Sequence, residues 1–350
     1  MMNEKTPQRF EAWWHGEIID RPPVSLAVKP ARPFRGPESR HATLRERWLD
    51  AEFQVDSAIA WIERLDFAGD SFPIFCPNVG PEITATLFGC ELEFGEHTSW
   101  SHPVIKEPED WERLVATPPN FDNIYWKTVE RMTELATERC GGRYVVGMTD
   151  LHGNYDILAG LRDPEMLCLD LLDCPDLVRR AGHHVSEGFV EAFRRAYRQV
   201  SAAGHPATCW TPFLHRGPAY IPSCDFWCMV SADMAREFIL PDILLEMQPL
   251  ERSIFHLDGP QALKHLDLLL EIPQLGAVQW VYGAGQGPAA RWIDVYRRIL
   301  KAGKSVQVFA QSLEDARTVL DAVGPRGVWL AISHSFDSVA DADAYLGGLM

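Results

Sequence analysis

Short runs rich in β-branched and aromatic residues alternate along the chain with longer segments whose apolar residues recur every three to four positions. The first pattern is typical of buried strands and the second of amphipathic helices. Eight runs are predicted to be strands: Val24–Val28, Phe72–Phe75, Tyr144–Met148, Ala207–Trp210, Ser253–Leu257, Ala277–Trp280, Ser305–Phe309 and Val328–Ile332. Because helices separate them, the pattern predicts a parallel α/β protein, a closed (β/α)8 TIM barrel.

Helical periodicity fills the intervals between the predicted strands. The predicted helices are Glu38–Leu65, Ile124–Cys140, Pro164–Ala203, Ser231–Leu245, Gln261–Leu270, Ala289–Ala302 and Leu313–Val323. The second strand is the least regular of the eight, because proline removes a backbone donor and Pro73 and Pro77 flank the run.

Three further segments are added to this barrel. Residues 1–20 are expected to form a helical extension that covers one end of a single domain spanning residues 1–350. Alternating polar and apolar residues within 91–100 predict a hairpin inserted after the second strand. The aromatic-rich loop from Trp210 to Phe226 follows the fourth strand, and loops of this length are usually functional.

The composition argues against two classes of binding partner. The 350 residues carry a formal net charge of −16, which argues against nucleic-acid or anionic-membrane partners, because both require clustered Lys and Arg. Apolar stretches are short and a signal-like start is lacking, so we expect a cytoplasmic protein. Eight Cys without framework spacing suit a reducing compartment. Cys224 and Cys228 could form a metal-binding pair, but two small apolar side chains are the better interpretation.

The strongest chemical signal is His256 with Asp258, two residues apart at the carboxyl end of the fifth predicted strand. Side chains two apart in a strand share one face, and barrel enzymes place their chemistry at this end. An imidazole beside a carboxylate can ligate a metal, share a proton or bind a polar substrate. The structural alternative is that Asp258 only caps the helix that follows Gly259.

Other candidates lie in segments that follow predicted strands. His152 comes after the third strand beside Asp150, and Tyr155 is three residues further on. Asp225, if buried among aromatic rings, would be a general acid with a raised pKa, although capping a helix is an equal alternative. Trp210 and Trp280 are expected to wall an apolar pocket for a small-molecule substrate.

The glycine-rich run 283–287 does not have the spacing of a dinucleotide-binding fingerprint, so no nucleotide cofactor is expected.

Three blocks occur in a characteristic order: Asp20–Val24, Ser231–Pro241 and His256–Gly259. With them, nearly the whole chain resembles the uroporphyrinogen decarboxylase superfamily. That superfamily also contains cobalamin-independent methyltransferases, which move methyl groups between corrinoid proteins and thiols. The resemblance therefore implies a methyltransferase that exchanges a methyl group between a corrinoid protein or small donor and an acceptor.

In the thiol-alkylating members, zinc is held by a His-x-Cys pair and by a later Cys. The matching positions here are His256, Asp258 and His334, so the resemblance implies a zinc site with harder ligands than thiolates. Asp225 and His152 would handle protons. The corrinoid would enter only through a partner protein.

Two alternatives stay open under the same resemblance. A decarboxylase that needs no cofactor would act on a tetrapyrrole or a smaller carboxylic acid, with Asp70 and Arg32 binding the substrate. A non-catalytic partner of a corrinoid protein would keep the fold without the reaction. Because members of the superfamily are often dimers, a homodimer is also expected.

Overall fold

The computed structural model describes residues 2–349 and contains a curled sheet of seven strands in the order β2-β1-β11-β10-β9-β8-β7. All neighbouring strands are parallel except β1 and β2, which are antiparallel. The strands are β1 (Val24–Val28), β2 (Phe67–Gly69), β7 (Ala219–Tyr220), β8 (Arg252–Asp258), β9 (Ala277–Val281), β10 (Ser305–Ala310) and β11 (Val328–Phe336).

A second, two-stranded parallel sheet lies between the ends of this curve and consists of β3 (Ile74–Phe75) and β6 (Val145–Val146). One backbone hydrogen bond of 2.9 Å, from Met148 N–H to the carbonyl of Thr208, connects it to the segment predicted as the fourth strand. That segment makes only an isolated bridge at Ala207. Within residues 2–349 the architecture is therefore a barrel-like α/β fold with a parallel half-barrel, and the predicted closed eight-stranded barrel is not established.

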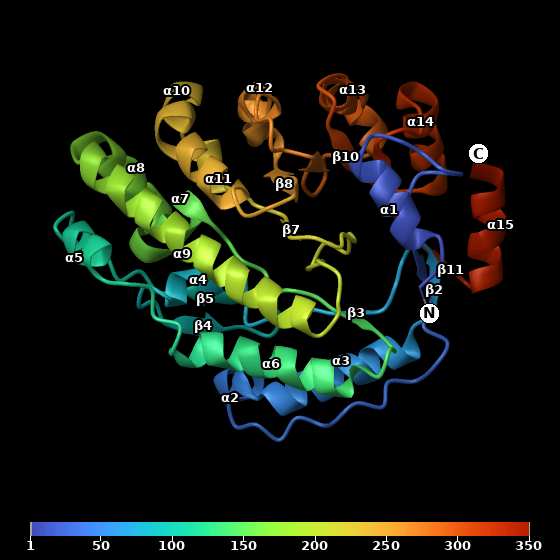
Figure 1. Cartoon of the computed structure of the whole chain (residues 1–350), viewed down its shortest axis with the longest axis horizontal. Coiled ribbons are helices and arrows are strands. Elements are labelled where there is room, and N and C mark those ends of the chain that lie inside the picture. Colours follow the sequence, from blue (N-terminus) through green and yellow to red (C-terminus); the bar gives the residue numbers. More distant parts are fainter. Residues whose placement is uncertain (1, 350) are drawn as a thin grey trace.

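Helices surround the strands, as Figure 1 shows, with α10, α12, α13 and α14 following one another along one side and α3 and α6 on the opposite side. The α-helices are α1 (Thr6–Trp14), α2 (Leu44–Leu49), α3 (Ala51–Arg64), α4 (Ile83–Thr86), α5 (Asp110–Ala116), α6 (Ile124–Cys140), α7 (Asn154–Arg162), α8 (Pro164–Asp173), α9 (Pro175–Ala202), α10 (Ala232–Met234), α11 (Leu240–Met247), α12 (Leu266–Leu270), α13 (Ile293–Lys301), α14 (Leu313–Val323) and α15 (Val339–Leu349). Shorter turns are η1 (Phe226–Met229), η2 (Ala235–Ile239), η3 (Pro260–His265) and η4 (Ala289–Trp292).

Capping residues explain why two helices begin and end where the sequence predicts. The side chain of Asn123 accepts from the N–H of Trp126 at 2.9 Å at the start of α6, and Gly141, with φ of 52°, ends it. Ser312 caps α14 in the same way, through the N–H of Asp315. Polar caps of this kind supply partners for the first amides of a helix, which have none within it.

The predicted hairpin insertion is confirmed. Strands β4 (Leu92–Phe94) and β5 (Ser99–Ser101) pair in antiparallel register, with Glu93 opposite Trp100. Trp48 stacks on Phe94 with the ring centroids 5.6 Å apart, and this contact joins the hairpin to α2.

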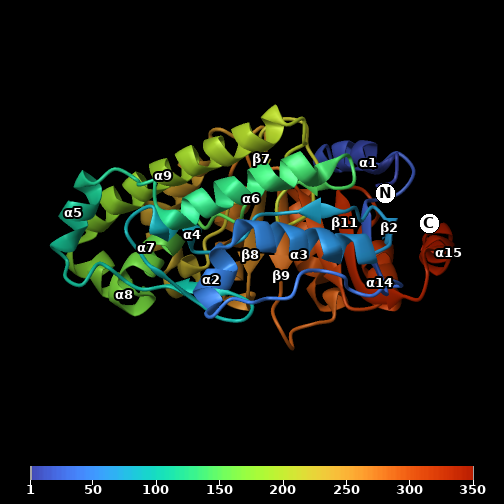
Figure 2. The same cartoon turned by 90° about the horizontal axis from the view of Figure 1, so that it is seen from below.

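The N-terminal helix α1 covers the amino end of the half-barrel. Phe10 packs edge-on against Trp329 of β11 at 5.0 Å, and the hydroxyl of Ser305, the first residue of β10, donates to the carbonyl of Trp13 at 2.5 Å. Figure 2 shows α1 close to the two chain ends at one end of the molecule. Because α1 covers the amino end of the half-barrel, it does not cover the carboxyl ends of β8 and β9.

Buried apolar residues from α1 to α15 form one contiguous cluster. No helix within residues 2–349 combines the length and apolar character that crossing a membrane requires.

Candidate functional site

Three potential metal ligands converge at the carboxyl end of β8. Each of Asp225, His256 and Asp258 offers a ligand atom, and these atoms all lie within 4.8 Å of one another. His256 and Asp258 are two residues apart in β8, so the alternation of the strand places them on one face. Asp225 precedes the short helix η1 and is more exposed than the other two.

His256 is oriented by a network of amide side chains on the neighbouring strands. It is the register partner of Gln279 on β9, and its Nδ1 is hydrogen-bonded to Oε1 of that glutamine. The amide nitrogen of Gln279 donates to Thr211 Oγ1 at 2.9 Å and to Gln307 Oε1 at 2.8 Å. Since both amide hydrogens are engaged, Nδ1 of His256 must be the donor. The lone pair of Nε2 is therefore left for a metal or a substrate.

Trp210 flanks this imidazole. Its ring lies edge-on to His256 with centroids 5.4 Å apart, and it is 41% exposed. The indole thus covers one side of His256 while a large part of its surface stays open to solvent.

Asp225 is held in place by Asp156 of α7. The Asp156 carboxylate accepts from the N–H of Asp225 at 3.0 Å and from the N–H of Phe226 at 2.8 Å. Although Asp225 is exposed, desolvation of its carboxyl group by the surrounding protein, together with the nearby charge of Asp156, raises its pKa to about 6. A carboxyl group with that pKa can donate and accept protons near neutral pH.

Asp150 and His152 extend the charged cluster from the segment after β6. Burial raises the pKa of Asp150, although His152 and His256 act in the opposite direction. Burial alone would lower the pKa of His152 and is its largest single influence. Surrounding carboxylates outweigh it, so the pKa lies above the ordinary value; these are Asp150, Asp156, Asp225 and Glu82. Two imidazoles and several carboxylates therefore share one electrostatic environment.

The donor set suits a divalent metal. One neutral imidazole nitrogen and two carboxylates form a coordination group that zinc accepts, with less affinity for soft metals than thiolates provide. Cys228 donates its S–H to the carbonyl of Asp258 at 3.7 Å. Burial and the charge of Asp225 raise the pKa of Cys228 to about 11, and burial also raises the pKa of Cys224.

His334 is not part of the group that contains His256 and Asp258. It is exposed on β11, edge-on to Phe336 at 4.6 Å. Two strands, β9 and β10, separate β8 from β11, which amounts to about 14 Å along the sheet. Among residues 2–349, the group of potential ligands that contains His256 and Asp258 therefore has Asp225, and not the expected His334, as its third member.

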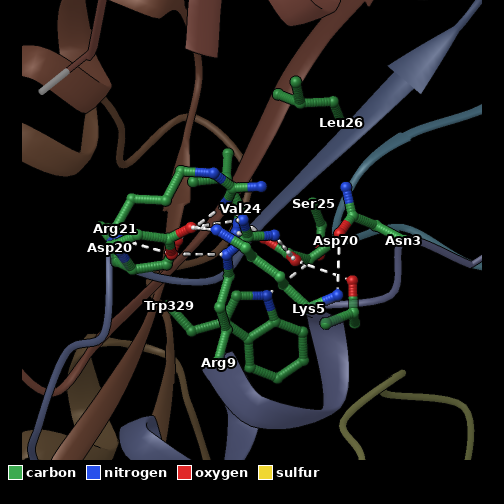
Figure 3. Close-up of polar contacts among 12 residues, drawn as sticks. Asn3, Lys5, Arg9, Asp20, Arg21, Val24, Ser25, Leu26, Asp70 and Trp329 are labelled. Carbon is green, nitrogen blue, oxygen red and sulfur yellow. Dashed lines mark hydrogen bonds and ion pairs between the residues drawn. The ribbon is translucent and has the colours of Figure 1, made fainter. Parts of the chain in front are cut away.

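Asp70, an expected substrate-binding residue, is instead a structural anchor (Figure 3). It is 1% exposed and accepts from Arg9 Nη1 at 2.9 Å, from Thr6 Oγ1 at 2.8 Å and from Val24 N–H at 2.9 Å. Arg21 forms a further ion pair with it. With its lone pairs engaged by α1 and β1, Asp70 has no free acceptor for a ligand.

The remaining expected binding residues are either paired on the surface or buried. Arg32 donates to the carbonyl of Leu65 at 2.8 Å and pairs with Asp66 on the surface. Tyr155 and Trp280 are both 0% exposed.

Their aromatic contacts explain this burial. Tyr155 stacks on Phe226 at 6.1 Å, and Trp280 packs on Trp292 at 5.2 Å. Alternation along β9 directs Gln279 and Trp280 to opposite faces, so Trp280 lies in the core rather than at a pocket wall.

Sequence reasoning missed the residues that position the site, above all Gln279, Gln307 and Asp156. A signal existed for the first two. Each is a glutamine inside a mostly apolar strand, and a buried polar side chain needs a partner.

No protein-family model matches the chain, and no curated protein matches it. Among solved structures, the chain is similar to a methyltransferase from Methanosarcina mazei, with a TM-score of 0.63 and 14% sequence identity over 98% of each chain. At that identity the likeness shows the fold, which the two proteins share over nearly their whole length.

Proposed function

We propose that the protein is an enzyme of the methyltransferase type, which transfers a methyl group from a corrinoid protein or small methyl donor to an acceptor. The observation that carries this proposal is the convergence of Asp225, His256 and Asp258 within 4.8 Å. The full-length likeness in fold to a methyltransferase supports it.

His256, Asp258 and Asp225 would hold zinc, through Nε2 of the imidazole and one oxygen of each carboxylate. Bound zinc would act as a Lewis acid that lowers the pKa of the acceptor group. Gln279 keeps the imidazole in the tautomer that this role requires.

Two other groups would take up the proton that the acceptor releases. The pKa values of Asp150 and His152 are raised above their ordinary values, so each is a stronger base than the same side chain in water. Trp210 would present its exposed surface to the donor and limit the access of water to His256. A corrinoid would arrive on a partner protein at the carboxyl end of β8.

The direct experiment combines methylcobalamin as donor with a thiol as acceptor, and follows the methylcobalamin absorbance after loading the purified protein with zinc. The methyl group moves from cobalt to sulfur, cobalt keeps the electron pair of the broken bond as cob(I)alamin, and the thiol proton passes to a protein base. His256→Ala should lose at least 100-fold in rate. His334→Ala, a matched imidazole deletion outside the trio, should react as the wild type does. Equal rates in wild type and His256→Ala would contradict the proposal.

The decarboxylase alternative has less support, because Asp70 is saturated by Arg9, Arg21 and Thr6, and Arg32 is paired on the surface. Release of carbon dioxide from uroporphyrinogen in a direct assay would favour the decarboxylase over the methyltransferase. Tight binding of a corrinoid protein without any turnover would favour the non-catalytic alternative.

A further inference from the structure

A second concave site lies away from the trio, between α5, α9 and the η2–α11 segment. It encloses about 470 Å³, within the range of small-ligand pockets. Val115, Phe238 and Pro241 supply its apolar side chains, and Arg, His, Glu and Asp residues form the rest of the lining.

Asp242 of α11 also lines this cavity, although the residue is only 3% exposed. Among residues 2–349 no group donates a hydrogen bond to its carboxylate, and burial alone raises the pKa of Asp242 to about 7. The nearest cationic group is Nδ1 of His183, 3.7 Å away on an exposed ring that carries charge only when protonated. A buried carboxylate without a donor is unfavourable, so the cavity offers an acceptor that the protein leaves unused.

The packing of α9 and α7 keeps this carboxylate in place. Gly182 has no side chain, and a Cβ there would lie 2.6 Å from Asp242 Oδ2 and 3.0 Å from the ring of Tyr155. The Tyr155 hydroxyl is also buried without a hydrogen-bond partner. Two polar groups that lack partners therefore lie close to the same point of α9.

The other charged groups at the cavity already have partners of opposite charge. Arg179 lies over the ring of Phe238 at 4.9 Å and pairs with Glu237 at 2.7 Å. Arg180 pairs with Glu112 at 2.6 Å, and His183 lies 3.7 Å from Glu187. Asp242 has no permanently charged partner: its one ion-pair contact among residues 2–349 is His183, whose ring it shares with Glu187.

We propose that this cavity binds a small organic ammonium ion with an apolar body. The ammonium group donates to the Asp242 carboxylate, and the apolar body contacts Phe238, Pro241 and Val115. Glu246, one turn further along α11, does not compete for the cation, because it accepts from the backbone and side chain of Asn154 at 2.6 and 2.8 Å. The site stands apart from the proposed methyl transfer and does not depend on it.

The experiment is isothermal titration calorimetry of the full-length protein at pH 8, with 2-phenylethylamine as the probe and 2-phenylethanol as its neutral counterpart. The amine should bind at least 10-fold more tightly than the alcohol. Asp242→Asn should abolish that difference. Asp173→Asn, an equivalent change at an exposed position on α8, should retain it.

Lowering the pH to 5.5 should weaken amine binding, because Asp242 becomes protonated. The titratable and charged groups that face Asp242 are His183 and Arg179 on α9, Tyr155 on α7 and Glu246 on its own helix. Protonation of His183 adds a competing positive charge and acts in the same direction.

A second variant guards against misfolding of Asp242→Asn. Val115→Trp fills the cavity from α5 and should also abolish amine binding, while circular dichroism and thermal melting report whether each variant is folded. Equal affinity for the amine and the alcohol, tighter binding of 3-phenylpropanoate, no detectable amine binding, or unchanged binding by Asp242→Asn would each overturn the proposal.

Discussion

His256 and Gln279 face each other across β8 and β9 as register partners, and the hydrogen bond between Nδ1 and Oε1 fixes the tautomer of the imidazole. The amide of Gln279 can serve only as an acceptor towards His256, because Thr211 and Gln307 take both of its hydrogens. The chemistry available at Nε2 is thus set by a residue on another strand.

Removal of this glutamine should weaken metal binding without removing a ligand. Gln279→Ala is expected to lower zinc affinity about 10- to 100-fold, as the loss of outer partners of a ligating histidine commonly does. Competition with a chromogenic chelator measures the affinity. Gln274→Ala, an exposed glutamine in the loop before β9, is the matched control and should bind zinc as the wild type does. Unchanged affinity in Gln279→Ala would show that the amide network does not orient His256.

Asp156 should control both the position and the protonation of Asp225. Asp156→Asn keeps an oxygen for one backbone N–H but removes the negative charge that, after burial, raises the pKa of Asp225 to about 6. The pKa of Asp225 should therefore fall, and zinc should stay bound to a lower pH than in the wild type. An unchanged pH dependence of zinc binding would show that Asp156 does not control the protonation of Asp225.

Asp70 should matter for stability rather than for substrate affinity. Asp70→Ala leaves the guanidinium groups of Arg9 and Arg21 without their shared carboxylate in a buried position. Removal of one partner of a buried ion pair costs about 3–5 kcal/mol in the free energy of unfolding. Urea denaturation measures this change. An increase in KM without loss of stability would instead return Asp70 to substrate binding.

Asp242 should make stability depend on pH in the opposite sense to most carboxylates. Its pKa rises from 3.8 to about 7 on folding, so the folded state binds more protons than the unfolded state between these values. The stabilisation that Asp242 contributes to the folded state is therefore fully present below about pH 4, and it decreases as the pH rises towards 7. Asp242→Asn should raise the free energy of unfolding at pH 8 by up to about 4 kcal/mol and have little effect at pH 4. If Asp242→Asn changed the free energy of unfolding equally at pH 8 and at pH 4, the Asp242 carboxylate would not be titrating in this way.

Local signals predicted much of the fold. The runs at β8 to β11 are near-continuous apolar segments, as buried parallel strands require, and the capped helices α6 and α14 match their predicted bounds. The segment at Ala207 was less predictable, because a strand needs continuous pairing as well as composition. Here a single bridge and one further hydrogen bond replace a ladder.

The candidate site was predictable only where one element carries both residues. His256 and Asp258 are two apart in one strand, so local geometry brings them together. The position of Asp225, the third potential ligand, depends on how a distant loop folds. Asp156 fixes this position through the backbone N–H of Asp225, and no local sequence pattern reveals that contact. The resemblance assigned His334 to the site from its position in the sequence. In the fold, β9 and β10 lie between β8, which carries His256, and β11, which carries His334.

Zinc titration of the apoprotein by calorimetry, with the wild type compared with Asp225→Ala and His334→Ala, shows whether Asp225 belongs to the metal site. We expect one zinc ion per chain in the wild type and in His334→Ala, and at least a 100-fold loss of affinity in Asp225→Ala. Wild-type affinity in Asp225→Ala, or loss of zinc in His334→Ala, would contradict a metal site built from Asp225, His256 and Asp258.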